Sequence, residues 1–224
     1  MLKMYIGIFL PFTILFPVSA ATAVYRRLLS AEKTAAWYLL ADGIANIVAV
    51  SLAKSGINNM PVFHVYPVIE FLLLVLFFKQ NLRGTLIDRY AWLFIAGFIF
   101  FAVVDALFIQ SILHFNTYPR TLEALLLVGF ALFFFYKRID PAIAQKWSEE
   151  PSVWFVIAVL LYFSGALILF LFSGQLTKNS QANKLAWGIH ATLLLLLYIL
   201  FTVGFYRCRH RKAAGAVNTR LYAE

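Results

Sequence analysis

The sequence predicts an all-α membrane protein, a polytopic bundle of seven transmembrane helices with its amino terminus outside and its carboxyl terminus in the cytoplasm. Three observations predict this. Hydrophobic residues make up 62% of the 224 residues and charged residues only 13%, whereas soluble domains have about 45–50% and about 25%. Seven apolar runs are long enough to cross a bilayer. Lys and Arg are concentrated on one side of the expected bundle.

The seven runs are separated by short polar loops and followed by a basic tail at residues 207–224. A helix needs about 20 residues to cross a hydrocarbon core of about 30 Å. The transmembrane domain therefore covers residues 1–206. We expect kinks at Pro11 and Pro17 in the first span and at Pro67 in the third. The spans are expected at about 4–25, 35–54, 60–79, 90–113, 120–137, 152–175 and 184–206.

The distribution of positive charge gives the orientation. Fourteen of the 19 Lys and Arg residues follow spans one, three, five and seven, and five lie on the other side. The richer side is expected to be cytoplasmic. A cleavable signal peptide at residues 1–23 is the alternative, since small residues follow its apolar stretch. Its removal would place most of the positive charge outside, so we favour a retained first span. The expected location is a bacterial inner membrane, as a multi-pass protein.

Several classes of function find no support. The formal charge of +9 is explained by cytoplasmic anchoring residues, and no basic folded module predicts nucleic-acid binding. No Walker motif and no G-x-G-x-x-G predicts nucleotide binding. The single cysteine, Cys208, excludes an internal disulfide framework. The expected partner is the lipid bilayer, which the basic residues Arg207–Lys212 contact at its anionic surface.

Six ionisable residues interrupt the apolar runs, and none of them is Lys or Arg. A charge at the centre of a bilayer helix costs about 2.5–3.5 kcal/mol or more, so such residues are candidates for a functional site. Acids without a buried cation must be protonated, paired with histidine, hydrated or bound to a cation. The six are Asp42, His64, Glu70, Asp105, Glu123 and His190.

Depth along the spans separates these residues into two groups. Asp42 is expected in the inner half of the bundle, apart from the others, with Asn46 one turn away as a hydrogen-bonding partner. Glu123 follows Arg120 by three residues, which a local ion pair explains. These three polar residues, Asp42, Asn46 and Glu123, are therefore secondary candidates.

The remaining polar residues are expected in the outer half, on spans three, four and seven. Tyr66 shares a helix face with Glu70, and Trp187 shares one with His190. The expected ligand or ion pocket opens outward and has no basic counter-ion. Its residues are His64, Tyr66, Glu70, Asp105, Trp187 and His190.

Three functions fit this pocket. The first is a receptor-like or sensory module that binds a small ligand, a proton or a metal ion and acts through a membrane-embedded signalling partner. The second is a metal-dependent hydrolase of a lipid ester or amide, with zinc held by His64, Asp105, His190 and Glu70. The third is a proton or cation transporter that uses Glu70 and Asp105 as relay carboxylates. We favour the first, which is not an enzyme, and keep the zinc-dependent hydrolase as the alternative.

Three stretches carry a resemblance to known proteins: residues 64–71 (HVYPVIEF), residues 154–165 with Phe170, and residues 187–190 (WGIH). Together they resemble a group of uncharacterised seven-span inner-membrane proteins of bacteroidete-type bacteria. Members of that group occur near sensor-kinase systems, so the resemblance implies a role in signalling.

A weaker resemblance is to the seven-span zinc-dependent lipid hydrolases that include alkaline ceramidases and progestin/adipoQ receptors. It implies zinc bound by His64, His190 and Asp105, with Ser164 nearby. The chain lacks the paired histidines that this family has in its last span. The segment Ser164–Gly165–Ala166 also has a simpler interpretation as a close-packing surface for a neighbouring helix.

Overall fold

The computed structural model describes residues 10–138, 147–173 and 180–210, and every regular element in these ranges is helical. Within these ranges, six helices are long and apolar enough to cross a membrane, as expected for an all-α, multi-pass membrane protein. In chain order the elements are α2 (Leu10–Thr13), α3 (Leu15–Val24), η2 (Tyr25–Arg27), α4 (Ser30–Lys54), α5 (Met60–Asn81), α6 (Leu86–Val104), η3 (Asp105–Ile109), α7 (Thr117–Tyr136), η4 (Trp147–Glu149), α9 (Pro151–Leu171) and α11 (Ser180–His210).

The first expected span, residues 4–25, is seen in part. Its described portion is α2 and α3, which are separated at Ile14, between Pro11 and Pro17. Residues 1–9 lie outside the described residues. The two short helices are not among the six helices of membrane-crossing length. The expected break at the prolines is therefore present, because proline cannot donate its backbone nitrogen to the helical ladder.

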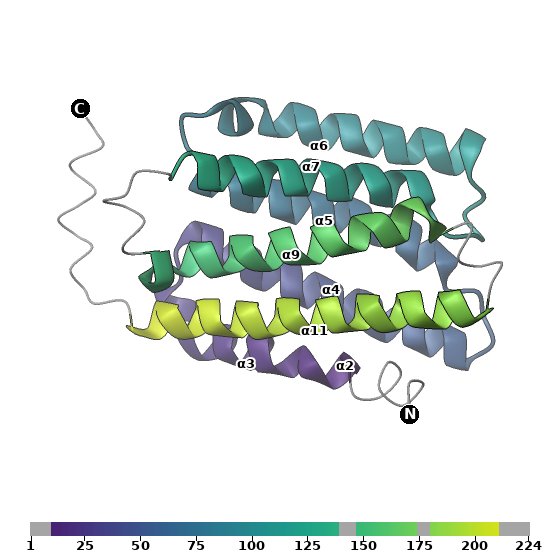
Figure 1. Cartoon of the computed structure of the whole chain (residues 1–224), viewed down its shortest axis with the longest axis horizontal. Coiled ribbons are helices and arrows are strands. Elements are labelled where there is room, and N and C mark those ends of the chain that lie inside the picture. Colours follow the sequence, from purple (N-terminus) through teal and green to yellow (C-terminus); the bar gives the residue numbers. More distant parts are fainter. Residues whose placement is uncertain (1–9, 139–146, 174–179, 211–224) are drawn as a thin grey trace.

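The long helices form two layers (Figure 1). Helices α4, α5 and α6 pack in sequence in one layer, and α7, α9 and α11 pack in the other. Contacts of α5 with α7 and of α4 with α9 join the layers, while α3 packs on α11 and α4 at one edge. Chain order makes neighbouring helices antiparallel, so the starts of α5, α7 and α11 meet at one end with the carboxyl end of α9.

Local signals set several helix ends. Proline occupies the first turn of α5 and of α9, where its missing N–H has no partner to lose. The Glu32 carboxylate accepts a hydrogen bond of 2.8 Å from the backbone N–H of Leu29 at the start of α4. Gly56 and Gly84 have φ of 72° and 75° after α4 and α5, a left-handed conformation that glycine adopts without steric cost.

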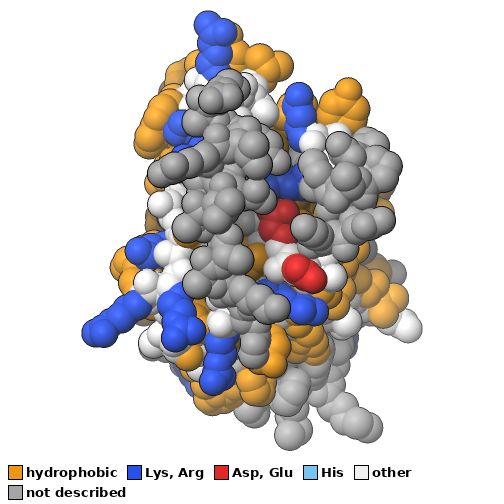
Figure 2. All heavy atoms as spheres, turned by 90° about the vertical axis from the view of Figure 1, so that its left-hand side faces the viewer, with side chains coloured by type: hydrophobic (Ala, Val, Ile, Leu, Met, Phe, Trp, Pro, Cys, Tyr) orange, Lys and Arg blue, Asp and Glu red, His pale blue; other side chains and the backbone are white. Residues whose placement is uncertain are grey.

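Positive charge gathers at one end of the bundle. Figure 2 shows this end, with blue Lys and Arg side chains spread across it. The helix order brings together here the short segment Tyr25–Arg27, the end of α5 with Lys79, and the end of α11 with Arg207 and Arg209. This is the end that the charge distribution predicts to be cytoplasmic.

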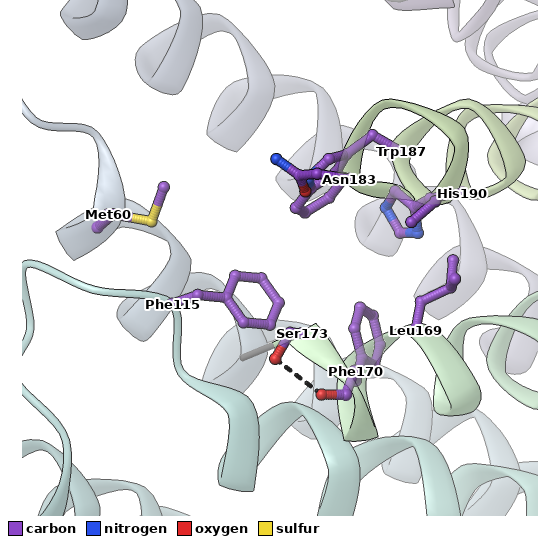
Figure 3. A pocket seen from close by; sticks show the side chains of 9 residues that line it. Met60, Phe115, Leu169, Phe170, Ser173, Asn183, Trp187 and His190 are labelled. Carbon is purple, nitrogen blue, oxygen red and sulfur yellow. Dashed lines mark hydrogen bonds between the residues drawn. The ribbon is translucent and has the colours of Figure 1, made fainter. Parts of the chain in front are cut away.

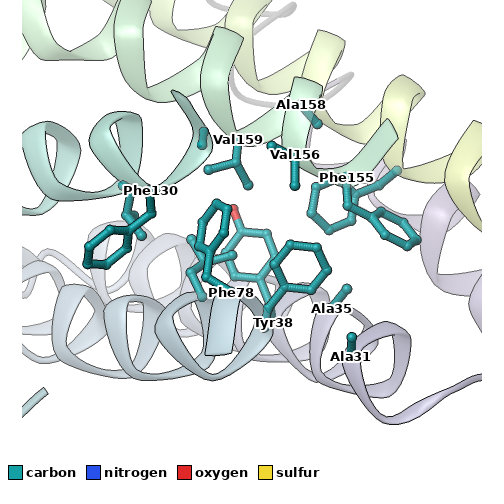
Figure 4. Close-up of a cluster of buried hydrophobic side chains, with 14 of the residues drawn as sticks. Ala31, Ala35, Tyr38, Phe78, Phe130, Phe155, Val156, Ala158 and Val159 are labelled. Atoms are coloured by element: carbon teal, nitrogen blue, oxygen red, sulfur yellow. The ribbon is translucent and has the colours of Figure 1, made fainter. Parts of the chain in front are cut away.

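The apolar core lies between the layers and is rich in aromatic rings (Figure 4). Phe155 of α9 lies 5.0 Å from Phe201 and 4.8 Å from Phe205 of α11, measured between ring centroids. In the segment Ser164–Gly165–Ala166, close packing of α9 on α11 agrees with the interpretation for Gly165 and Ala166, whereas Ser164 is exposed. A Cβ atom at Gly165 would lie 2.7 Å from Cδ1 of Leu193, so a side chain fits here only if Leu193 moves.

Candidate functional site

A cavity of about 210 Å³ lies between α9 and α11 at the end opposite the basic one (Figure 3). The start of α5 contributes Met60, and the connection between η3 and α7 contributes Phe115. Most of the lining is apolar, with few polar groups, which is typical of a site for a small organic molecule. The lining residues are Met60, Phe115, Leu169, Phe170, Ser173, Asn183, Ala186, Trp187 and His190.

Aromatic rings surround His190 in this cavity. Its ring centroid lies 5.4 Å from that of Trp187, 5.5 Å from that of Tyr162 and 5.9 Å from that of Phe170. Trp187 also meets Phe115 edge to face, at 6.0 Å. The Nδ1 atom of His190 is buried and has no hydrogen-bond partner among the described residues. It therefore offers one unused polar contact to an occupant of the cavity.

Hydrogen bonds of Ser173 and Thr117 connect the end of α9 to the start of α7 beside the cavity. The Ser173 hydroxyl donates to the backbone carbonyl of Phe170 at 2.9 Å, drawn as a dashed line in Figure 3. The same hydroxyl lies 2.7 Å from that of Thr117, at the start of α7. These bonds fix the end of α9, and with it Phe170, against α7.

A second polar group lies deeper in the bundle and centres on Asp42. The Oδ1 atom of Asp42 accepts hydrogen bonds from Tyr66 of α5 at 3.1 Å and from Asn46 at 3.0 Å. Its Oδ2 atom accepts from the hydroxyl of Tyr198 of α11. The hydroxyl of Tyr66 also lies 3.1 Å from Oε1 of Glu70. The sequence placed Asp42 apart from the other acids, and this expectation was wrong, because Tyr66 joins Asp42 to Glu70.

The expectation that the acids lack a basic counter-ion was also wrong. Arg120 of α7 is 6% exposed, and its Nη1 atom donates to Glu70 and, at 3.0 Å, to Glu123. The predicted local pair between Arg120 and Glu123 is therefore present, but it extends to a different helix. Arg120 is the first residue of the expected span 120–137, a position that predicts a charge at the rim, but α7 begins three residues earlier, at Thr117, and places Arg120 inside the bundle.

Phe170 connects the cavity to this buried cluster. Its ring lines the cavity and lies 5.6 Å from Cζ of Arg120, which is also 5.3 Å from the ring centroid of Tyr66. Cation–π contacts of this kind favour the guanidinium over either ring. The two sites therefore share one packing contact. We name the six residues Asp42, Tyr66, Glu70, Arg120, Glu123 and Tyr198 the buried polar cluster.

His64 and Asp105 lie away from both sites. The Nε2 atom of His64 is 2.9 Å from the carbonyl of His114, so this histidine ties the start of α5 to the loop before α7. Asp105 begins the π-helical turn η3 at the end of α6, and its carbonyl accepts from the backbone of Gln110 at 2.8 Å. Its carboxyl group is fully buried, and neither oxygen has a hydrogen-bond partner among the described residues.

The structure does not assemble the metal ligands that the hydrolase hypothesis requires. Of the described residues, which include His64, Glu70, Asp105 and His190, no three His, Cys, Asp or Glu side chains are grouped to hold a metal ion. His190 lies among aromatic rings, Glu70 is bound to Arg120, and His64 binds a backbone carbonyl. Each of the expected ligands has a different environment.

Sequence reasoning missed part of each site. It did not select the apolar cavity residues Phe115 and Phe170, because aromatic residues are frequent throughout the chain, with 23 Phe. It also missed Tyr198, whose hydroxyl reaches Asp42 from a residue 156 positions away. The stripe of Asn183, Trp187 and His190 at helical spacing was the available signal, and all three line the cavity.

Comparisons of the chain with protein-family models, with curated proteins and with solved structures gave no match in any of the three. The site is therefore interpreted from its own geometry.

Proposed function

We propose that the protein is a receptor-like membrane module that binds a small organic ligand in the cavity at Trp187 and His190. The observation that carries this proposal is the cavity itself, about 210 Å³ in volume and lined by Phe115, Phe170 and Trp187 with one unsatisfied nitrogen on His190. An apolar cavity of about 150 Å³ accommodates benzene. A molecule with a single ring therefore fits here.

The side chains that line the cavity indicate which chemical class of ligand it would bind. None of the described residues that line the cavity carries a carboxylate, so the usual partner of a cationic ligand is absent from this part of the lining. The best match is a neutral ring with one hydroxyl or carbonyl group that reaches Nδ1 of His190.

The distribution of positive charge supports access from outside. We propose that the segment containing α2 and α3 belongs to a seventh membrane-crossing segment, and that the basic end faces the cytoplasm of a bacterial cell. The cavity then opens toward the extracytoplasmic side. Binding shifts Phe170 against Arg120, which joins α5 to α7 through Glu70 and Glu123. A membrane-embedded signalling partner, as the resemblance to the bacteroidete-type group implies, reads this change.

Fluorine NMR with the purified protein in detergent micelles tests the binding site. The probes are para-fluorophenol and, as an apolar molecule of similar shape, para-fluorotoluene. We expect saturable binding of the phenol to the unmodified protein. The variant Ala186→Leu places a larger side chain in the cavity and should abolish binding. Ala53→Leu adds the same atoms at an exposed position of α4 and should leave binding unchanged.

A second variant tests the polar contact. In His190→Phe, the preference for the phenol over the toluene should disappear. That preference should be about two- to tenfold in the unmodified protein, as one hydrogen bond of about 0.5–1.5 kcal/mol gives. Binding that is not saturable, or that is equally strong in Ala186→Leu, would contradict the proposal.

A further inference from the structure

We propose that the buried polar cluster is a proton-binding site, in which Asp42 and Glu70 share one dissociable proton across the hydroxyl of Tyr66. This inference concerns a different set of atoms from the ligand cavity and does not rest on the ligand proposed for it. Two observations support it: a count of hydrogens and a count of charges.

The hydrogen count concerns Tyr66. Its hydroxyl oxygen lies 3.1 Å from Oδ1 of Asp42 and 3.1 Å from Oε1 of Glu70. A hydroxyl group has one hydrogen to donate, whereas an ionised carboxylate only accepts. Tyr66 can therefore satisfy one carboxylate, and the second contact becomes a hydrogen bond only when that carboxyl group carries a proton of its own.

Two arrangements of the bridge meet this requirement. In one, Glu70 donates its proton to the oxygen of Tyr66, and Tyr66 donates to Asp42. In the other, Asp42 donates to Tyr66, and Tyr66 donates to Glu70. Moving from one to the other transfers one proton at each of the two contacts and leaves the number of O–H bonds unchanged. Release of the proton to a water molecule breaks one carboxyl O–H bond, forms one O–H bond on the water, and leaves both carboxylates ionised.

The number of charged groups in the buried polar cluster also favours a proton on the bridge. The cluster holds three carboxyl groups, on Asp42, Glu70 and Glu123, around the single guanidinium of Arg120. With all three ionised the net charge would be −2, at sites no more than 5% exposed. Unpaired charge of this kind is costly in a low-dielectric interior. Binding a proton on the bridge removes half of this excess.

Glu123 is the other carboxyl group that Arg120 contacts. Glu123 is fully buried, and while its Oε2 atom accepts from Arg120, its Oε1 atom has no hydrogen-bond partner among the described residues. The shared guanidinium therefore does not satisfy all the carboxylate oxygens around it. Glu123 could therefore bind a proton of its own, and the variant Glu123→Gln distinguishes that proton from the one on the bridge.

The other titratable groups around the bridge are neutral hydroxyls and an imidazole. Tyr38 extends from α4, Tyr162 from α9 and Tyr198 from α11, and all three lie within electrostatic range of Asp42 and Glu70. His190 of α11 lies within electrostatic range of Arg120. Among the described groups that face the bridge, Arg120 is thus the cation that contacts it.

Infrared spectroscopy tests the shared proton, because a protonated carboxyl group has a C=O stretching band that a carboxylate lacks and that shifts in deuterium oxide. Spectra of the full-length protein in lipid bilayers are recorded at neutral pH. The variants Asp42→Asn and Glu70→Gln keep the size of each side chain and supply an amide hydrogen in place of the proton. We expect each of them to lose the same carboxyl band, since a single proton serves both residues.

Two matched variants identify the band. Glu123→Gln removes the third carboxyl group of the cluster, and Asp105→Asn removes a buried carboxyl group outside it. Both should keep the bridge band, and Tyr66→Phe should shift it by removing the bridging hydroxyl. The proposal is overturned if the unmodified protein has no carboxyl band beyond that lost in Asp105→Asn, or if only one of Asp42→Asn and Glu70→Gln loses a band. The comparison of the unmodified protein with Asp105→Asn leaves Asp42 and Glu70 unchanged. It therefore tests the proposal even if a variant of the buried polar cluster does not fold.

Discussion

The side chain of Asn116 donates a hydrogen bond of 2.7 Å to the backbone carbonyl of Phe63. In a regular helix this carbonyl would accept from the backbone of residue 67, but residue 67 is Pro67, which has no N–H. Asn116, in the loop before α7, thus supplies the donor that α5 lacks. The expected disturbance at Pro67 is met by a partner from a different helix connection.

This relationship predicts a double-mutant cycle. Asn116→Ala leaves the Phe63 carbonyl without its partner and should lower the free energy of unfolding by about 1–3 kcal/mol. In a Pro67→Ala background the helix supplies its own N–H, so the same change should cost much less. Denaturation of the protein in mixed micelles, followed by circular dichroism, measures both values. Equal losses in the two backgrounds would show that Asn116 acts in some other way.

The buried ion pair predicts a large loss on removal of its cation. Arg120→Met leaves Glu70 and Glu123 unpaired inside the bundle, and we expect a loss of about 3–5 kcal/mol in unfolding free energy. The loss should be smaller in a Glu70→Met background, because one of the two stranded carboxylates is then absent.

Lys79→Met is the matched control for that prediction. The Nζ atom of Lys79 lies 2.5 Å from Oδ1 of Asp88, and both side chains are about a quarter to a third exposed. Exposed pairs of this kind contribute about 0–1 kcal/mol, so the loss should stay within that range. If Lys79→Met lowers the free energy of unfolding as much as Arg120→Met does, burial does not explain how much each ion pair contributes to stability.

Close packing of α9 on α11 predicts a size-dependent effect at Gly165. Gly165→Ala places a Cβ atom 2.7 Å from Leu193, and such overpacking costs about 1–3 kcal/mol. Leu193→Ala removes the opposing atoms and should reduce the effect of Gly165→Ala in the double variant. Gly129→Ala has no heavy atom within 4 Å of the new Cβ and should be neutral or stabilising. Thermal unfolding in micelles compares the four proteins.

The orientation predicts which loops a membrane-impermeant thiol reagent reaches. In a Cys208→Ser background, Ser55→Cys places a thiol after α4 and Arg83→Cys places one after α5, at exposed positions. Labelling of Ser55→Cys in intact cells, and of Arg83→Cys only after the cells are opened, is expected. The reverse pattern would invert the proposed topology and turn the cavity toward the cytoplasm.

The sequence by itself determined that the chain is all-helical and crosses a membrane several times, because length and hydropathy of each run depend only on local residues. Expected spans such as 60–79 and 120–137 agree closely with α5 and α7. Local spacing also predicted the pair of Arg120 with Glu123, three residues apart on one helix.

Only the tertiary structure decided which helices meet, and this changed the site. Depth along a span says nothing about which neighbour a side chain faces, so His64 was grouped with His190 although it binds a loop carbonyl instead. Asp42 was set apart although Tyr66 and Tyr198 reach it from two other helices. The position of Arg120 at the start of its expected span predicts a charge at the membrane surface, although this residue is the counter-ion of Glu70 inside the bundle. Contacts between residues far apart in sequence depend on the packing of whole helices, which local patterns do not encode.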